Sequence, residues 1–205
     1  MKNKLTWLEG ALVLAPFVLL LIFWHDIPPR VPIHWNLSSE IDGWGGKEFY
    51  LPLLPLISFG LIMLLRLLPQ FDPKLQTKLA LNERMLDVLQ ILRLAFAAFC
   101  FAIFLALLTA ALGYSISSRI ISSAVLILFA VLGNYLGVLR PNYFIGLRTP
   151  WTLESPATWR ATHRLGGRLM FFGSLALLLL QFVLSDQLTF LLIITATLSF
   201  AAWTL

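Results

Sequence analysis

Residues 133–167 of this 205-residue chain read GNYLGVLRPNYFIGLRTPWTLESPATWRATHRLGG, and the rest of the sequence is arranged around this polar stretch. It contains or adjoins five arginines, Arg140, Arg148, Arg160, Arg164 and Arg168. It also carries Tyr143, Trp151 and Trp159, aromatic residues of the kind found at membrane interfaces. The flanking sequence on both sides is almost entirely apolar. We therefore expect specific contacts in an arginine-rich loop between two membrane helices.

The composition indicates an integral membrane protein. Hydrophobic residues make up 59% of the chain, charged residues 12%, and the mean hydropathy is +0.86, far from the values of a water-soluble domain. The first apolar segment is followed by several more and is closed by no small-residue cleavage site, so we interpret it as a first spanning helix and not a signal peptide. The single cysteine, Cys100, lies in an apolar run, which excludes a disulfide framework and a CxxC motif.

Six segments are long and apolar enough to span a bilayer, which takes about 20 residues each. They are Leu5–Trp24, Leu51–Leu68, Ile91–Leu112, Ile120–Leu139, Leu169–Leu184 and Leu188–Leu205. The last two are joined only by Ser185-Asp186-Gln187, which predicts a tight helical hairpin. The sequence thus predicts an all-α, six-span protein.

Lysine and arginine are distributed unevenly between the two sides of this arrangement. One side, with the amino-terminal tail and the second and fourth loops, has Lys2, Lys4, Arg66, Lys74, Lys78, Arg84 and the five arginines above; the other has Arg30, Lys47 and Arg119. Positive residues are retained inside the cell. Both termini and the 140–167 loop are therefore predicted to be cytoplasmic, and the first loop extracellular.

The first loop, His25–Tyr50, is predicted to form a small ordered cap. Three prolines force an extended entry, residues 31–35 are typical of a short edge strand, and Asp42-Gly43 and Gly45-Gly46 favour turns. His34 and Asp42, with His25, Asp26 and Glu40 nearby, are weak candidates for a metal site because imidazole and carboxylate suit zinc. No fixed-spacing ligand pair supports a metal, and His34 could instead hydrogen-bond within the loop.

The second loop predicts a cytoplasmic amphipathic helix. Asp72-Pro73 is a good helix start, and leucines recur at helical spacing from Leu75 through Leu79 to Leu89, so the helix is expected to run unbroken into the third span. Arg93, about one turn inside that span, is expected to snorkel to the head groups or to pair with Asp87 or another loop.

The fourth span ends in a GxxxG pair, Gly133 and Gly137, which lets another helix approach closely. Asn134 beside it is predicted to bond across to a neighbouring helix, with a substrate contact as the alternative. Beyond it, Ser155-Pro156 should open a short helix through His163 that ends at Gly166-Gly167. Trp159 and His163 share one face of it and Arg160 and Arg164 another, which would place the helix flat on the membrane surface.

Residues 140–167 strongly resemble the signature of the SdpI family of bacterial membrane proteins, in which an asparagine-aromatic core leads to G-[IL]-R-T-P-W-T-L and then to W…TH-R-x-G-G. Residues 27–47, IPPRVPIHWNLSSEIDGWGGK, resemble the small domain of unknown function that often precedes this module, but depart from it at Ser39, where glycine is common. The resemblance implies immunity to a secreted toxin peptide of the sporulation-delay type, and the holding of a cytoplasmic repressor at the membrane.

Position by position, the resemblance assigns the cytoplasmic motif to Asn142, Arg148, Thr149, Trp151, Trp159, His163 and Arg164. It assigns the outer motif to His34, Asn36 and Asp42; Trp35 and Trp44 adjoin that motif and are added as candidate contacts of the toxin. No catalytic residue and no cofactor are implied. We predict a two-helix module at 1–70, a four-helix module at 71–205, and location in the bacterial cell membrane as a multi-pass protein.

Three other functions stay open from the residues alone. His163 with Glu154 could serve as acid and base in a membrane enzyme, although no nucleophile stands in a recognisable setting. The arginines could bind acidic groups of a partner or lipid phosphates, beyond their role in topology. A small-molecule or lipid-binding transporter would need ionisable groups at membrane depth, and the predicted spans hold almost no charge. Direct nucleic-acid binding is not expected, and the sequence does not define an oligomeric state.

Overall fold

The computed structural model describes residues 2–36, 40–76 and 82–204. These parts form α1 (Lys2–Phe23), β1 (Arg30–Trp35), β2 (Ile41–Gly46), α2 (Lys47–Phe71), α3 (Glu83–Ala111), α4 (Ser118–Leu136), α5 (Pro150–Glu154), α6 (Pro156–Leu180) and α7 (Asp186–Thr204). Six of the helices, all but α5, are long and apolar enough to cross a membrane. The predicted six-span helical membrane protein is confirmed, and the outer loop adds a two-stranded antiparallel ribbon.

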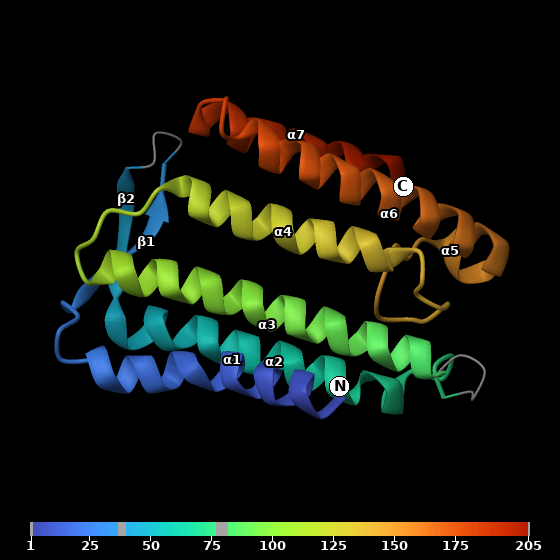
Figure 1. The fold of residues 1–205 in the computed structure, drawn as a ribbon, viewed down its shortest axis with the longest axis horizontal. Helices are drawn as coiled ribbons and strands as arrows, with labels where there is room; N and C mark the ends of the chain where they lie inside the picture. The colour runs from blue at the N-terminus through green and yellow to red at the C-terminus, as the bar shows by residue number, and fades with distance from the viewer. Residues whose placement is uncertain (1, 37–39, 77–81, 205) are drawn as a thin grey trace.

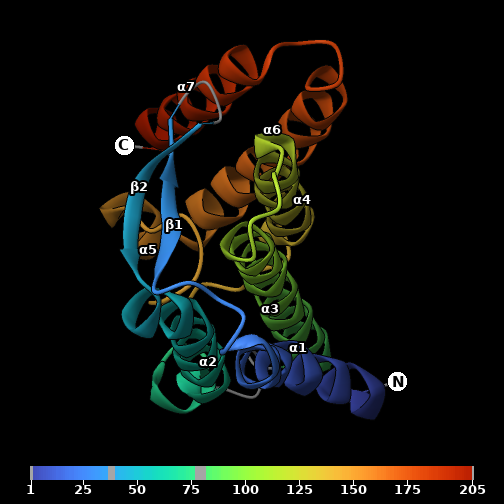
Figure 2. The same cartoon turned by 90° about the vertical axis from the view of Figure 1, so that its left-hand side faces the viewer.

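The helices run side by side, with α3 at the centre of one half of the molecule (Figure 1). α3 packs against α1, α2 and α4; α4 then packs chiefly on α6, and α7 lies against α6. Figure 2 shows the same order from the ribbon. Both termini and the α2–α3 and α4–α6 connections lie at one end, here called the arginine end, and β1, β2 and the other turns at the opposite, ribbon end (Figure 1). That the arginine end faces the cytoplasm stays a prediction.

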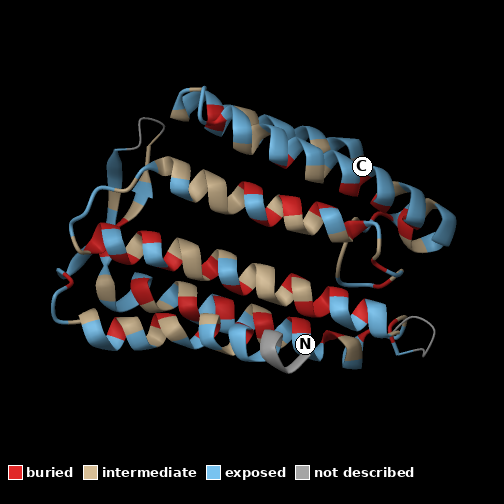
Figure 3. Cartoon of the chain, in the orientation of Figure 1, coloured by how far each residue is buried: buried red, intermediate tan, exposed pale blue. Residues whose placement is uncertain are grey.

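The outer surfaces of the helices are largely exposed, α7 above all (Figure 3). Exposed residues there are mostly large and apolar, including Leu179 of α6 and Leu191 and Leu198 of α7. In a bilayer such a surface meets hydrocarbon, so its exposure is the normal state of a spanning helix and costs no hydrophobic free energy. The buried side chains concentrate between the helices and at the two ends.

Two predicted helix boundaries are wrong. Residues 73–76 form turns, and α3 begins only at Glu83, where the Asn82 side chain accepts a hydrogen bond from Met85 N at 3.0 Å; Lys78 and Leu79 lie outside the described residues. Asp72 does cap the turn with one carboxylate oxygen. Its other oxygen accepts a hydrogen bond from Tyr143 N in the α4–α6 connection, and this contact holds the chain away from a helical path. The expected short surface helix from Ser155 to Gly167 is instead the first part of the unbroken α6.

The glycines explain why α6 continues. A Cβ atom on Gly133 would lie 2.6 Å from Phe171 N, and one on Gly167 would lie 2.6 Å from Gly133 O. Only glycine fits at both positions, so α4 and α6 meet backbone to backbone, and this packing stabilises a helix through Gly166-Gly167 that glycine alone would weaken. The close approach at Gly133 agrees with the prediction; a Cβ atom on Gly137 would lie 3.4 Å from Arg164 Cγ, an ordinary contact, so the role of Gly137 stays a prediction. Asn134 is exposed and makes no hydrogen bond within the described residues, so its expected bond to a neighbouring helix is wrong.

In the described part of the chain, the spans contain a cluster of charge around the buried carboxylate of Glu9, which was not predicted from the sequence. Glu9 of α1 is 1% exposed, and its two carboxylate oxygens accept hydrogen bonds from Arg66 Nε at 2.9 Å and Arg93 Nε at 3.3 Å. Arg93 therefore pairs with α1, and the expectation that it snorkels or pairs with Asp87 is wrong. One carboxylate joins α1, α2 and α3, which offsets the cost of charge at this depth.

Replacing Glu9 by glutamine should lower the free energy of unfolding by about 3 kcal/mol, because the largely buried Arg93 then lies among apolar helices without its countercharge. The measurement is thermal unfolding of the purified protein in detergent micelles. Glu48→Gln, at an exposed site in the first turn of α2, is the control and should change stability little. Equal melting temperatures for both variants would contradict a stabilising role of the cluster.

Candidate functional site

The α4–α6 connection is built on the side chain of Asn142, which is fully buried. Its amide nitrogen donates to Arg140 O and Ile145 O, both at 2.9 Å, and its oxygen accepts from Phe144 N at 2.9 Å and Ile145 N at 2.6 Å. Two donors and two acceptor positions are thus all used. Asn142 supplies the backbone of an irregular segment with the partners that a helix would otherwise provide, and it has no group left for a partner molecule.

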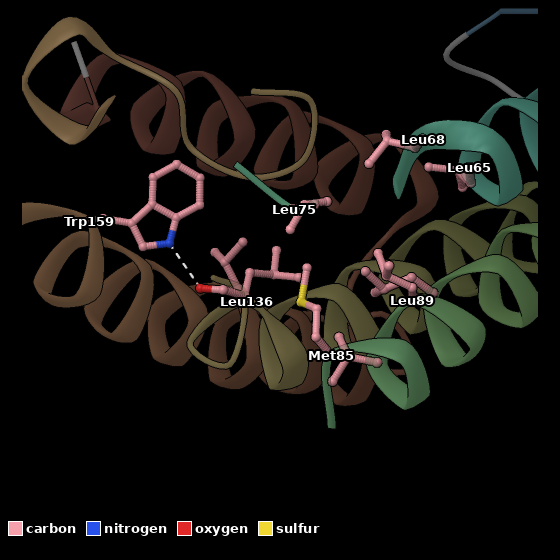
Figure 4. Packing of buried hydrophobic residues seen from close by; sticks show 10 residues of the cluster. Leu65, Leu68, Leu75, Met85, Leu89, Leu136 and Trp159 are labelled. Carbon is pink, nitrogen blue, oxygen red and sulfur yellow. Dashed lines mark hydrogen bonds between the residues drawn. The ribbon is translucent and has the colours of Figure 1, made fainter. Parts of the chain in front are cut away.

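Trp159 and His163 hold this connection from α6. They lie one helical turn apart, are both fully buried, and stack with ring centroids 4.0 Å apart. The indole Nε1 donates to Leu139 O at 2.9 Å, at the end of α4 (Figure 4). The two rings do share a face, as predicted, but that face turns inward; the expectation that it rests on the bilayer is wrong, because the ring atoms bind the loop. Arg160 and Arg164 are exposed, as expected.

His163 has a defined protonation pattern in this setting. Its Nε2 accepts a hydrogen bond from Leu147 N at 3.1 Å, and its Nδ1 lies 2.8 Å from Trp159 O. A backbone N–H can only donate and a carbonyl can only accept, so the ring is neutral with its proton on Nδ1. Both nitrogens are engaged by the backbone.

Gly146 makes the contact between the loop and His163 possible. Its φ of +114° lies in the region that favours glycine, and a Cβ atom there would overlap Nε2 of His163. The following residues turn into α5, where Thr149 and Thr152 form a capping box and the Thr152 hydroxyl donates to Leu147 O at 2.9 Å. The residues Gly146 to Thr152 therefore form a single hydrogen-bonded turn around the imidazole.

Asp72 joins this loop to the α2–α3 connection. It is fully buried; one oxygen accepts from Lys74 N at 2.9 Å and the other from Tyr143 N at 2.7 Å. Lys74 Nζ donates to Leu153 O at 3.1 Å and lies 4.4 Å from the centre of the Tyr143 ring. A core of buried apolar residues from α2, α3 and α4 packs beneath, against Trp159 (Figure 4).

The seven residues predicted for the cytoplasmic motif fall into two groups. Asn142, Thr149, Trp159 and His163 are buried, whereas Arg148, Trp151 and Arg164 are exposed. Arg148 donates to Tyr143 O at 2.6 Å. The buried group builds the loop, and only the exposed group can touch a partner directly.

At the ribbon end, His34 and Asp42 face each other across β1 and β2, with Nδ1 and Oδ1 2.5 Å apart and both side chains exposed. Asn36 Nδ2 donates to Glu40 Oε2 at 3.2 Å. Trp35 is half-buried and Trp44 is 48% exposed. The edge strand is confirmed; the turns expected at Asp42-Gly43 and Gly45-Gly46 are wrong, because all four residues belong to β2.

Close packing explains the glycines of β2. A Cβ atom on Gly43 would lie 2.8 Å from His34 Cβ, and one on Gly45 would overlap the Tyr50 ring. Lys47 fixes the ribbon to the bundle, because its Nζ donates to Trp24 O at 2.9 Å and Ile27 O at 2.7 Å beyond α1. Ser39 lies outside the described residues.

The geometry gives little support to a metal site at His34. Across residues 2–36, 40–76 and 82–204 no three histidine, cysteine, aspartate or glutamate side chains come together. His34 and Asp42 offer two ligands, and Glu40 is engaged with Asn36. Their arrangement fits a hydrogen-bonded pair that fixes the register of the ribbon.

Comparison with known proteins matches each end of the chain to a family model. Residues 138–205 match the SdpI/YfhL protein family, and residues 11–59 match a domain of unknown function, DUF1648. The carboxy-terminal part of the chain is thus similar to the SdpI family. Over 197 residues it is 26% identical to the immunity protein SdpI of Bacillus subtilis strain 168, an alignment that covers 95% of this chain and 89% of that protein. No solved structure matches it significantly.

The family match places the two candidate sites in separate segments. The SdpI-family segment begins at Val138 and contains the whole loop from Asn142 to His163 together with α6 and α7. The DUF1648 segment contains the ribbon and parts of α1 and α2. Both belong to a multi-pass membrane protein, as predicted.

Sequence reasoning missed three residues on which these sites depend: Glu9, the cross-loop role of Asp72, and Gly146. Glu9 stands alone in an apolar helix, which is itself a signal, since an unpaired carboxylate is costly there. The contact of Asp72 with Tyr143 spans 71 positions and leaves no local pattern. Gly146 lies in a loop, where glycine is common, so its position in the sequence does not reveal its contact with His163.

Replacing Gly146 by alanine should destabilise the protein more than the same change at Gly113. Gly113 also has a positive φ, +90°, but nothing lies within 4 Å of a Cβ atom added to it. Gly113→Ala therefore measures only the backbone strain, about 1 kcal/mol. Gly146→Ala adds the overlap with His163. Thermal unfolding of both variants in micelles tests this; a shift at Gly146 no larger than that at Gly113 would contradict the close packing.

Proposed function

We propose that this protein protects its cell from a secreted peptide toxin of the sporulation-delay type, and that it also binds a cytoplasmic repressor. The observation that carries the proposal is the similarity to the immunity protein SdpI, which extends through 95% of the chain and so includes both the ribbon and the arginine end. Membrane immunity is the function of the relative; the type of toxin and the repressor are our inference.

The ribbon is the proposed toxin-binding surface. It stands at the end opposite the termini (Figure 1), and its His34, Asp42 and Trp44 side chains are exposed. The backbone beneath them is held in register by strand pairing and by Lys47. A preorganised surface with an exposed indole and a polar pair can bind a peptide with little loss of conformational entropy.

The arginine end is the proposed repressor-binding surface. Arg148 and Trp151 project from a loop whose backbone is fixed by buried side chains. A planar guanidinium next to an exposed aromatic ring suits acidic or aromatic groups of a protein partner. The scaffold residues Asn142 and His163 would support this surface without touching the partner.

Enzyme function at His163 is disfavoured by its hydrogen bonds. A general base needs a free nitrogen within reach of the substrate, and both nitrogens of this buried ring are engaged by the backbone. His34 is accessible, but among the described residues no third histidine, cysteine or carboxylate side chain joins it and Asp42. We therefore treat the protein as non-enzymatic.

Survival of a sensitive bacterial host challenged with a sporulation-delay-type toxin tests the proposal. The host expresses the wild-type chain, Trp44→Ala, Tyr114→Ala or Arg148→Gln, each at equal membrane level. Wild type should protect, and Trp44→Ala should protect at least about tenfold less, the effect of losing roughly 1.4 kcal/mol of binding. Tyr114 is the matched control: an exposed aromatic residue at the same end but outside the ribbon.

Three results would be informative against the proposal. No protection by wild type would refute immunity to that toxin while leaving the fold and family unchanged. Equal loss with Trp44→Ala and Tyr114→Ala would exclude the ribbon as the specific surface. Full protection by Trp44→Ala together with loss in Arg148→Gln would move the essential contact to the arginine end.

A further inference from the structure

Two hollows open along the outer side of the contact between α4 and α6 and meet at Gly137. The first, about 210 Å³, is lined among others by Arg84, Arg140 and Arg160. The second, about 360 Å³, runs on past Arg164 and Arg168 to Phe171 and Phe172, with Asn134 and the glycines of the helix contact as its floor. We call the two together the α4–α6 furrow.

The furrow carries uncompensated positive charge. Arg84, Arg140, Arg160, Arg164 and Arg168 are all exposed, and within the described ranges none of these guanidinium groups takes part in a salt bridge. Positive charge retained on one side of the membrane requires only the count of arginines. It does not require five of them to line two hollows that share Gly137, so the topology rule leaves this arrangement unexplained.

The furrow is also polar at one end and apolar at the other. Arg160, Arg164, Arg168 and Phe172 follow one another at intervals of four residues and form a stripe on α6. Side chains on a helix lean toward its amino terminus, which for α6 is the arginine end, so the guanidinium groups reach toward that end. Phe172 lies about 12 Å deeper than Arg164 at 1.5 Å per residue.

We propose that the α4–α6 furrow binds an anionic phospholipid, with its phosphate among Arg160, Arg164 and Arg168 and an acyl chain along the glycine floor toward Phe171 and Phe172. Guanidinium groups bind phosphate oxygens in a bidentate manner. Basic hollows between spanning helices are suited to lipid head groups. An acidic peptide could meet the arginines, but its backbone could not follow the furrow to Phe172, which lies within a spanning helix.

A bound lipid also explains why Asn134 is unpaired within the described chain and why it lines the furrow together with glycines. Asn134 has no hydrogen-bond partner in the described chain although it lies in a span, and it lines the furrow beside Arg164 and Arg168. Its amide can donate to a phosphate or ester oxygen. The proposal does not depend on the toxin or the repressor.

Native mass spectrometry of the full-length protein, released from micelles with added phosphatidylglycerol or phosphatidylcholine, tests the proposal. Wild type should retain phosphatidylglycerol in preference to phosphatidylcholine. The double variant Arg164→Gln with Arg168→Gln should bind phosphatidylglycerol about 30-fold more weakly, since each arginine contributes roughly a factor of five to six near an anionic lipid. Arg30→Gln with Arg148→Gln removes the same charge outside the furrow and should bind like wild type.

A second variant distinguishes lipid binding in the furrow from a general effect of positive charge. Asn134→Trp keeps every arginine but fills the hollow from an exposed position, and it should lose phosphatidylglycerol as the double variant does. Glycerol phosphate, the soluble head-group fragment, should fail to displace the lipid at millimolar concentration. Equal binding of both lipids by wild type, equal loss in the two charge variants, full binding by Asn134→Trp, or displacement by glycerol phosphate would each overturn a phospholipid site in the furrow.

Discussion

The structure depends on how the irregular backbone between α4 and α6 is supplied with hydrogen-bond partners. A helix satisfies its own peptide groups, but a loop folded back against membrane helices cannot rely on water for all of them. Here the partners are side chains: Asn142 binds four backbone groups, His163 binds the N–H of Leu147, and Asp72 binds that of Tyr143. Each net bond contributes only about 1 kcal/mol, yet leaving a buried group unpaired costs more. The loop therefore has one arrangement.

This arrangement also determines what faces outward. Because Trp159 and His163 point into the loop, the residues one position further along α6, Arg160 and Arg164, face away from it. The glycine contact with α4 sets the rotation of α6 as well, since Gly133 and Gly167 allow no side chain between the helices. The buried rings and the arginine stripe thus lie on two different faces of one helix, about 100° apart, in one fixed rotation.

Much of the fold followed from patterns that a sequence shows directly. Uninterrupted apolar runs predicted six spans, the GxxxG pair predicted a close helix contact, and the proline-rich entry predicted the strand at Val31–Trp35. Errors arose where a distant contact outweighed a local preference. Gly166-Gly167 ends a helix by propensity, but packing on α4 carries α6 through it. Trp159 suits an interface by composition, but a carbonyl at Leu139 and the imidazole of His163 hold it inside.

The candidate sites were predictable in composition but not in role. The motif located the loop, and the structure then divided its residues into buried supports and exposed contacts, a distinction that spacing alone does not contain.

The division between buried and exposed residues also limits how a signal could pass between the two ends of the molecule. Coupling requires two arrangements that an outer ligand distinguishes. The loop is too fully bonded to have two, whereas the contact of α3 with α4 carries no glycine seam and joins the ribbon half, α1 to α3, to α4, on which α6 packs. A signal from the ribbon would most readily move these halves as units, and the loop and the arginine stripe would be carried with α6.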